Sequence, residues 1–159
     1  MNKLVDKLSI LLKEKGKMLC TAESCTGGLI AKLMTDRAGS SSVFERGFVT
    51  YSNDSKRELL EVAAETLKAH GAVSKPTALE MAKGALSRSN ADIAVSCTGV
   101  AGPGGGSDEK PVGLVYIGWA DKDGAESKEY HFAGSRENIR QETAKAALSL
   151  ALERLNGTI

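Results

Sequence analysis

MLCTAESCTGG, residues 18–28, passes from a short apolar run into a glycine-rich segment with helical periodicity. When a strand ends at a hydroxyl-bearing residue and a helix begins directly after it, that hydroxyl lies at the carboxyl edge of the sheet. There it lies beside the first N–H groups of the helix, which have no backbone partner. Acyl transfer requires this arrangement, because it needs an exposed nucleophile beside hydrogen-bond donors that stabilise a developing oxyanion. Ser24 is therefore either a nucleophile or only the N-cap of the helix. Gly27 and Gly28 each cost a helix about 1 kcal/mol relative to alanine, which indicates a need for close backbone approach.

Outward from this stretch, helices and strands alternate along the chain. The expected helices cover residues 3–15, 26–35, 53–62, 64–70, 74–89 and 137–155, and the expected strands cover residues 18–22, 44–51, 93–97, 112–120 and 127–132. The turn sequence of residues 121–124 joins the last two strands in a hairpin. The pattern predicts an α/β fold, a three-layer α/β/α sandwich with a mixed, mostly parallel five-stranded sheet that ends in this antiparallel hairpin. With no repeat and no linker, we expect a single domain over residues 1–159.

Composition excludes several classes of protein. The 21 basic and 20 acidic residues nearly cancel, and aromatic residues make up only 4%, so we expect no nucleic-acid partner. No apolar stretch approaches the ~20 residues that a membrane span needs, and the N-terminus is unlike a signal peptide. Three cysteines without a C-x-x-C pair predict a reduced, cytoplasmic setting with no disulfide framework. No group of His, Cys, Asp or Glu has the spacing of metal ligands, so we expect no metal.

Three polar segments directly follow expected strands: residues 23–25, 51–56 and 98–106. Ligands of open α/β sheets bind at the carboxyl ends of the strands. If these strands are parallel neighbours, the three segments converge on one site.

The third segment, TGVAGPGGGS at residues 98–107, places five glycines in eight positions. Such a loop can turn several N–H groups toward one anion. Its spacing fits neither a dinucleotide fingerprint nor a Walker loop. It is either a flexible surface loop or a ligand loop, and its position after a buried strand favours the ligand loop.

The second segment offers a base for Ser24. A Ser-His-Asp triad is poorly supported, because His70 and His131 fall where surface or structural histidines are common. Lys56 and Tyr51 remain as activators in a Ser-Lys arrangement. A lysine base near neutral pH needs a pKa well below its usual value, which desolvation in a closed pocket supplies. The alternative is that Lys56 is an ordinary solvated helix residue.

Cys25 is the rival nucleophile. It lies one residue inside the predicted helix N-terminus, where a thiolate is favoured. It is equally well read as a small packed residue.

Together, TAESCTGG (residues 21–28), GFVTYSNDSK (residues 47–56) and SCTGVAGPGGGSDEKPVG (residues 96–113) closely resemble the C-terminal domain of the competence-damage-inducible protein CinA. The similarity is greatest to its stand-alone members, the nicotinamide mononucleotide deamidases, and it covers nearly the whole chain. It implies a cytoplasmic amidohydrolase that converts nicotinamide mononucleotide to nicotinate mononucleotide and ammonia in pyridine-nucleotide recycling. It implies no metal or organic cofactor.

The resemblance also implies residue roles. A serine nucleophile with a lysine and a tyrosine nearby falls on Ser24, Lys56 and Tyr51. The expected substrate-binding residues are Glu23, Cys25, Thr26, Gly27, Gly28, Thr98, Gly99, Ala101, Gly102, Gly104 and Arg140. We expect the first N–H groups of the helix over residues 26–35 to hold the oxyanion. We expect the glycine loop and Arg140 to hold the nucleotide phosphate.

Two classes of function stay open, an enzyme and a module that binds a pyridine nucleotide or a larger partner without hydrolysis. The expected partner is a small-molecule nucleotide, with no nucleic acid and no membrane. The apolar face of the last helix could pack on the sheet or on a second subunit, so a homodimer also stays open.

Overall fold

The computed structural model describes residues 1–159, and its centre is one sheet with the strand order β2-β1-β3-β4-β5. The strands are β1 (Leu19–Glu23), β2 (Phe44–Val49), β3 (Ile93–Gly99), β4 (Leu114–Asp121) and β5 (Gly124–His131). β1 pairs in parallel with β2 and β3, and β4 pairs antiparallel with β3 and β5. The predicted mixed sheet with a terminal hairpin is confirmed, and β4 alone runs against the other four strands.

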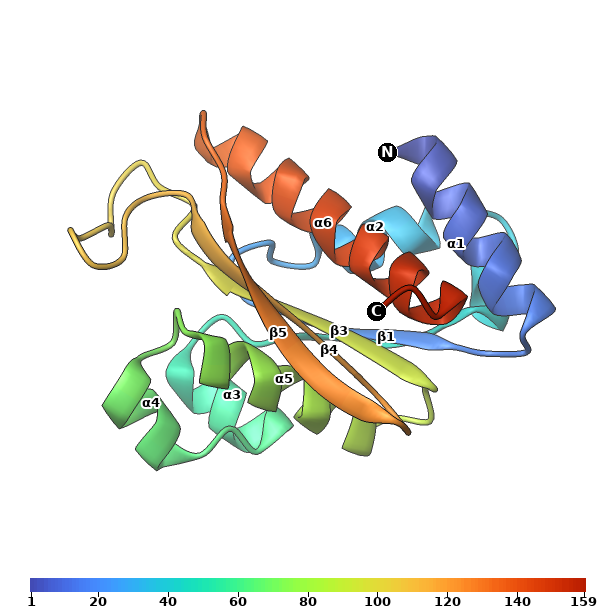
Figure 1. Cartoon of the computed structure of the whole chain (residues 1–159), viewed down its shortest axis with the longest axis horizontal. Coiled ribbons are helices and arrows are strands. Elements are labelled where there is room, and N and C mark those ends of the chain that lie inside the picture. Colours follow the sequence, from blue (N-terminus) through green and yellow to red (C-terminus); the bar gives the residue numbers. More distant parts are fainter.

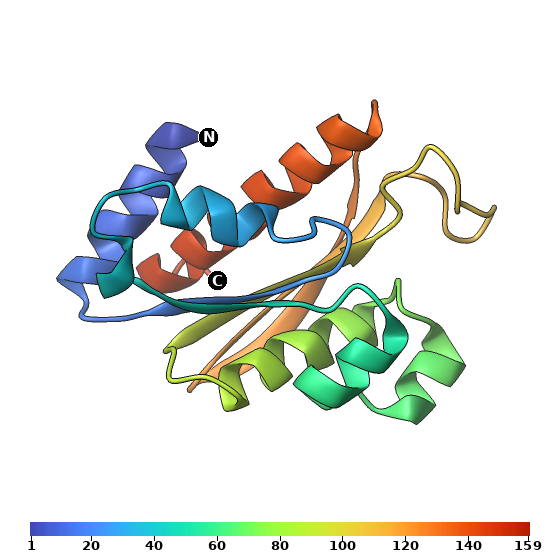
Figure 2. The ribbon, with the colours of Figure 1, turned by 180° about the vertical axis from the view of Figure 1, so that it is seen from behind.

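Helices cover both faces of the sheet, which confirms the three-layer sandwich (Figures 1 and 2). One layer holds α1 (Asn2–Glu14), α2 (Leu29–Thr35) and α6 (Arg136–Asn156), and the other holds α3 (Asn53–Leu60), α4 (Ala64–His70) and α5 (Lys75–Ser87). A short 3-10 helix, η1 (Ser40–Ser42), precedes β2. Each helix is either too short or too polar to cross a membrane.

The core is divided by the sheet, because successive side chains of a strand point to opposite faces. Leu19 and Cys97 belong to the larger apolar cluster, with residues of α1, α2 and α6. Cys20 and Ala94 belong to the smaller cluster, with residues of α3 and α5. The apolar side of α6 therefore packs on the sheet within this chain.

The helix predicted over residues 26–35 begins later, at Leu29. Gly27 and Gly28 have φ angles of +58° and +98°, in the left-handed region that glycine tolerates best, so residues 24–28 form a turn. The N-cap position belongs to Gly28. The interpretation of Ser24 as an N-cap is therefore wrong.

The buried carboxylate of Glu23 caps α2 in place of Ser24. Its Oε1 accepts from the Ile30 N–H at 2.8 Å, and its Oε2 accepts from the Ala31 N–H at 3.0 Å. The hydroxyls of Thr26 and Thr21 also donate to it, at 2.7 and 3.3 Å. A negative charge at a helix N-terminus is favourable, and these four hydrogen bonds compensate the buried Glu23 carboxylate for its loss of water.

The end of α6 is fastened to β4 at the edge of the sheet where β3 begins. Arg154 donates to both carboxylate oxygens of Asp121, at 2.6 and 3.1 Å, and its guanidinium lies 4.2 Å from the centre of the Trp119 ring. Asp121 is the register partner of Ile93, the first residue of β3. The β4–β5 turn therefore lies at the edge opposite the carboxyl ends of β1 and β3.

Candidate functional site

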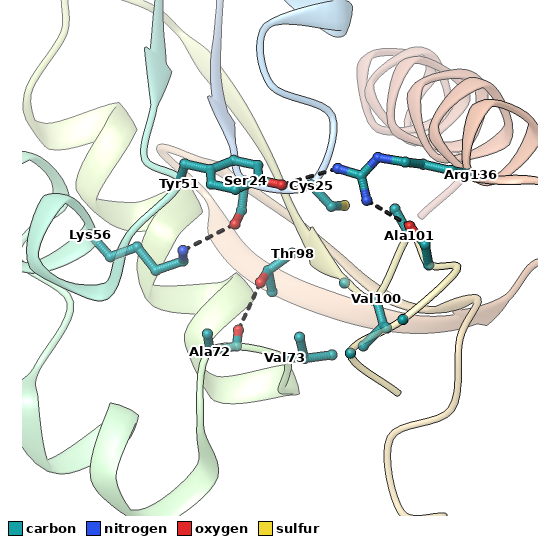
Figure 3. Close-up of a pocket in the computed structure, with 14 residues that line it drawn as sticks. Ser24, Cys25, Tyr51, Lys56, Ala72, Val73, Thr98, Val100, Ala101 and Arg136 are labelled. Atoms are coloured by element: carbon teal, nitrogen blue, oxygen red, sulfur yellow. Dashed lines mark hydrogen bonds between the residues drawn. The ribbon is translucent and has the colours of Figure 1, made fainter. Parts of the chain in front are cut away.

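A cavity of about 300 Å³ opens at the carboxyl ends of the parallel strands. All three polar segments predicted to converge contribute to its wall, together with the α4–α5 connection and the start of α6 (Figure 3). Its lining residues are Ser24, Cys25, Tyr51, Lys56, Ala72, Val73, Thr98, Gly99, Val100, Ala101, Gly102, Gly104, Gly105 and Arg136.

Ser24 and Lys56 meet at one end of this cavity. The Nζ atom of Lys56 lies 3.0 Å from the Oγ atom of Ser24, and it donates to the carbonyl of Thr50 at 2.8 Å. Ser24 is 8% exposed and Lys56 is 1% exposed, so the contact is shielded from bulk water. Figure 3 shows the lysine reaching from α3 toward the serine hydroxyl.

The position of α3 depends on a close contact with α5. A Cβ atom at Gly84 of α5 would lie 1.9 Å from the carbonyl oxygen of Leu60, the last residue of α3. Only glycine permits this approach, and α3 carries Lys56 against the sheet. Lys56 is therefore a buried residue, and its interpretation as a solvated helix residue is wrong.

Burial lowers the pKa of Lys56 below its ordinary value of 10.5. Desolvation disfavours the ammonium form, and no carboxylate lies within ion-pair distance to restore it. Its two polar partners, Ser24 and Thr50, are neutral. Lys56 donates to both of them. Once the amine is neutral, one N–H keeps the Thr50 carbonyl and the lone pair is free to accept from the serine hydroxyl.

Cys25 also lines the cavity, at 7% exposure, and belongs to the same apolar cluster as the fully buried Cys97. The Cys97 thiol lowers the pKa of Cys25, although burial opposes the shift. The two interpretations of Cys25, reactive thiol and packed residue, therefore both have a structural basis. Lys56 forms its hydrogen bond with the serine hydroxyl.

Tyr51 lines the cavity with an exposed side chain, at 62%. Its hydroxyl accepts a hydrogen bond from Nη2 of Arg136 at 3.1 Å, and Nη1 of Arg136 donates to the Gly102 carbonyl at 2.7 Å. Arg136 thus bridges the end of β2 to the glycine loop. The partner that orients Lys56 is the Thr50 carbonyl, and no contact joins the Tyr51 hydroxyl to the lysine.

Thr98 and Gly99 fix the floor of the cavity. The Thr98 hydroxyl donates to the Ala72 carbonyl at 2.8 Å, which holds the α4–α5 connection against β3. A Cβ atom at Gly99 would lie 2.6 Å from Cγ2 of Val115, so a glycine is required there. Ala101, Gly102 and Gly104 continue the wall, with a cis peptide bond between Gly102 and Pro103.

Five predicted substrate-binding residues do not line the cavity: Glu23, Thr26, Gly27, Gly28 and Arg140. Their contacts explain why, since the Glu23 carboxylate caps α2 and the Thr26 hydroxyl donates to it. Gly27 and Gly28 provide the turn before α2. Nη2 of Arg140 donates to the Thr26 carbonyl at 2.8 Å, so this arginine binds the turn instead of lining the cavity.

Glu23 also changes the expected oxyanion site. Its carboxylate occupies the N–H groups of Ile30 and Ala31, so of the helix expected over residues 26–35 only earlier N–H groups, in the turn before α2, can hold a substrate oxygen. The N–H groups of Cys25 and Thr26, in the turn just after Ser24, donate to no protein oxygen.

Arg136, Ala72 and Val73 line the cavity but were not among the predicted site residues. The sequence carries a signal that could have found Arg136: a cation in the first turn of a helix is unfavourable next to the helix dipole, which indicates that the side chain binds something else. The sequence carries no such signal for Ala72 and Val73. They reach the cavity through the α4–α5 connection, which follows no strand.

The fold and the cavity together define a class of protein, a three-layer α/β/α domain with a ligand-sized cavity at the carboxyl edge of a mixed sheet. Residues 1–155 match the family described as the CinA C-terminal domain, and the chain belongs to that family.

Relatives of two lengths share this sequence. The chain is 52% identical over 153 residues to nicotinamide-nucleotide amidohydrolase PncC of Enterobacter agglomerans, covering 96% of this chain and 93% of that protein. It is 50% identical over 146 residues to PncC of Escherichia coli K12, covering 91% and 88%. It also matches longer proteins, such as a CinA-like protein of Geobacter sulfurreducens at 52% identity, and there spans 35% of the relative's length and 91% of its own.

Solved structures agree with this fold. The crystal structure of competence/damage inducible protein CihA from Agrobacterium tumefaciens superposes with a TM-score of 0.94 at 50% identity, over 98% of this chain and 94% of that one.

Proposed function

We propose that this protein is a nicotinamide-nucleotide amidohydrolase that converts nicotinamide mononucleotide to nicotinate mononucleotide and ammonia, as a step in pyridine-nucleotide recycling. The observation that carries the proposal is the buried contact of 3.0 Å between Lys56 Nζ and Ser24 Oγ. A serine hydroxyl is a weak nucleophile unless a base lies within hydrogen-bond reach. The names of the PncC relatives supply the substrate class.

In the proposed reaction, the neutral amine of Lys56 takes the proton of Ser24 as Oγ attacks the carboxamide carbon. The Thr50 carbonyl holds one N–H of the amine, which leaves the lone pair directed at the serine. The resulting ammonium then protonates the carboxamide nitrogen, which leaves as ammonia as the C–N bond breaks. Water hydrolyses the acyl-enzyme with Lys56 again acting as the base.

The oxyanion is assigned to the backbone of the turn after Ser24. An N–H group of the residue that follows a nucleophile commonly fills this role in serine hydrolases, and here that residue is Cys25. Its N–H group and that of Thr26 have no protein oxygen as partner. They replace the N–H groups of α2, which Glu23 occupies.

The phosphate is assigned to Arg136 in place of Arg140. The Arg136 guanidinium lines the cavity and has only the Tyr51 hydroxyl and the Gly102 carbonyl as partners. No carboxylate neutralises it, so its charge is available to an anion. Arg140, in contrast, is bound to the Thr26 carbonyl and lies 3.6 Å from the Glu137 carboxylate.

The test is ammonia release from nicotinamide mononucleotide by the wild type and by Ser24→Ala. We expect the variant to lose more than about a thousandfold in kcat. Because the hydroxyl contributes little to ground-state binding, calorimetry should show the nucleotide still bound. Turnover retained in Ser24→Ala would shift the nucleophile to Cys25, and binding without turnover by the wild type would indicate a sensor module.

A further inference from the structure

A second cavity lies between α1 and the connection that joins α2 to β2, and its volume is about 150 Å³. Val43 lines it, and the Val43 carbonyl accepts from the N–H of Leu19, the first residue of β1. The second cavity therefore lies at the amino ends of β1 and β2, opposite the carboxyl ends that hold Ser24. Figure 2 shows the connection passing across α1. The two cavities share no lining residue.

Two basic side chains line the second cavity, and no acidic residue does. Lys13 of α1 forms no ion pair. Arg37 is held in place from outside the cavity, because its Nε donates to the Asp6 carboxylate at 2.6 Å and its Nη2 donates to the Asn2 carbonyl at 3.2 Å. Its Nη1 has no partner. The wall of the second cavity therefore carries an ammonium group that no carboxylate neutralises, beside a fixed guanidinium with free N–H groups.

A buried hydroxyl adds a neutral donor to this wall. The Oγ atom of Ser9, on α1, is buried and has no hydrogen-bond partner in the protein. Only two other buried side-chain atoms lack a partner, in Thr50 and Trp119, and neither of these residues lines this cavity or the one at Ser24. Because nearly all buried polar atoms are paired, the unpaired Ser9 hydroxyl indicates that a water molecule or a ligand occupies the second cavity.

The charge and the size of the second cavity select the chemistry of a ligand. Ammonium, guanidinium and hydroxyl groups all donate hydrogen bonds, so the ligand must be an acceptor, and the positive charge favours an anion. Pockets that hold drug-sized molecules begin at roughly 300 Å³. At about 150 Å³, the second cavity has room for one phosphate group and excludes a whole nucleotide.

We propose that the second cavity binds a phosphate group, with Lys13 and Arg37 supplying the positive charge and Ser9 donating its hydroxyl hydrogen to a phosphate oxygen. Free phosphate and the phosphate of a small ester both present this chemistry. Asp6 is a positioning residue, because its carboxylate holds the Arg37 guanidinium without lining the cavity. This site does not depend on the proposed function, since it contains neither Ser24 nor Lys56.

The test is a titration of the nitrogen-15-labelled full chain with inorganic phosphate at constant pH and ionic strength, followed through the backbone amide chemical shifts. We expect saturable shifts at residues 38–40, which line the second cavity. Lys13→Gln and Arg37→Gln should each weaken binding about tenfold, because each removes a charge-assisted hydrogen bond. The matched control is Lys7→Gln, which removes the same charge from α1 outside this cavity and should bind phosphate as the wild type does.

Ser9→Ala distinguishes a phosphate ligand from a water molecule at the unpaired hydroxyl. If the hydroxyl donates to phosphate, Ser9→Ala should weaken binding about three- to tenfold. Unchanged affinity in Ser9→Ala would overturn the role of Ser9. Arg37→Gln also removes the contacts with Asp6 and Asn2, so Lys13→Gln, which breaks no contact within the protein, decides whether charge in this cavity binds the anion.

Shifts confined to residues 102–105 would place phosphate only in the cavity at Ser24 and would overturn the proposal. Shifts that do not saturate, or that are the same in Lys13→Gln and Lys7→Gln, would also overturn it. Ribose 5-phosphate is the second probe: saturable shifts at residues 38–40 would identify phosphate esters as ligands, and shifts with inorganic phosphate alone would identify the free ion. The titration does not use turnover, so its result stands whether or not the chain releases ammonia from nicotinamide mononucleotide.

Discussion

Lys56 shows how one buried residue can be costly for the fold and useful for chemistry. Its amine lies between the Ser24 hydroxyl and the Thr50 carbonyl, at one end of the cavity and shielded from bulk water. Desolvation disfavours the ammonium, so the pKa falls and the amine becomes available as a base. The same desolvation reduces stability at any pH where the lysine is charged.

The pH dependence of stability should reveal this cost. The folded pKa of Lys56 is below the unfolded value, so between the two the unfolded chain binds more protons and stability rises with pH. Relative to Lys56→Met, the wild type should gain free energy of unfolding as pH rises through the folded pKa toward 10.5, by at most about 1.4 kcal/mol per pH unit. Urea unfolding of both proteins over this range measures it. A pH-independent difference would contradict a depressed pKa.

Arg136 should determine how strongly the phosphate group of the substrate contributes to binding. Replacing it with glutamine removes the uncompensated charge at the cavity, so KM for nicotinamide mononucleotide should rise about 10- to 100-fold. The matched measurement uses nicotinamide riboside, which lacks the phosphate, and there the wild type and Arg136→Gln should differ little. Equal losses on both substrates would mean that Arg136 shapes the cavity through Tyr51 and Gly102 instead.

At the scale of an element, α2 shows how a buried charge fixes a turn. Glu23 ends β1, caps α2 through two backbone N–H groups and receives two threonine hydroxyls. The turn between them carries Ser24 toward α3. Glu23 and Ser24 are neighbours in sequence, but the carboxylate lies on the α2 side of the sheet and the hydroxyl lies on the α3 side.

Glu23→Gln should destabilise the protein by about 1–3 kcal/mol, because the amide group can accept at one oxygen only and leaves a buried N–H of α2 without an acceptor. The midpoint of urea denaturation measures this loss. Glu126 of β5 is more exposed, and Glu126→Gln, as the control, should leave the midpoint nearly unchanged. An unchanged midpoint in Glu23→Gln would mean that capping of α2 adds nothing to stability.

The sequence predicted the elements well, because strand and helix periodicities are local. It also brought Ser24, Lys56 and the glycine loop together, since these follow strands that are parallel neighbours. It misplaced Glu23, although alternation along β1 carries a usable signal: residues 19, 21 and 23 share one face, and residues 20, 22 and 24 share the other. The resemblance pointed to Arg140 alone, although Arg136 lies one helical turn away, because only packing decides which of the two faces the cavity.

Across the whole molecule, the two ends of the β1 and β3 strands mark two different regions of the sheet. The carboxyl edge of β1 and β3 holds the cavity, and the opposite edge holds Arg154, Asp121 and Trp119, which tie the end of α6 to β4. The contacts that hold the end of α6 on β4 are therefore separate from the cavity, and their loss should leave the cavity intact.

Arg154→Ala tests this separation. Loss of the two hydrogen bonds to Asp121 and of the contact with Trp119 should cost about 2–3 kcal/mol of stability. Thermal unfolding measures the loss, and kcat/KM at a temperature well below the transition should stay within about twofold of the wild type. A large fall in kcat/KM for the folded variant would show that the edges are coupled through α6.

The β4–β5 turn has a practical use because it faces away from the cavity. Lys122 in this turn is 79% exposed, with Asp123 as its only charged contact. A label, a carrier bead or a sensor chip joined to the protein there would leave the opening turned toward the bulk solution. Small molecules would then reach an immobilised copy as freely as a dissolved one.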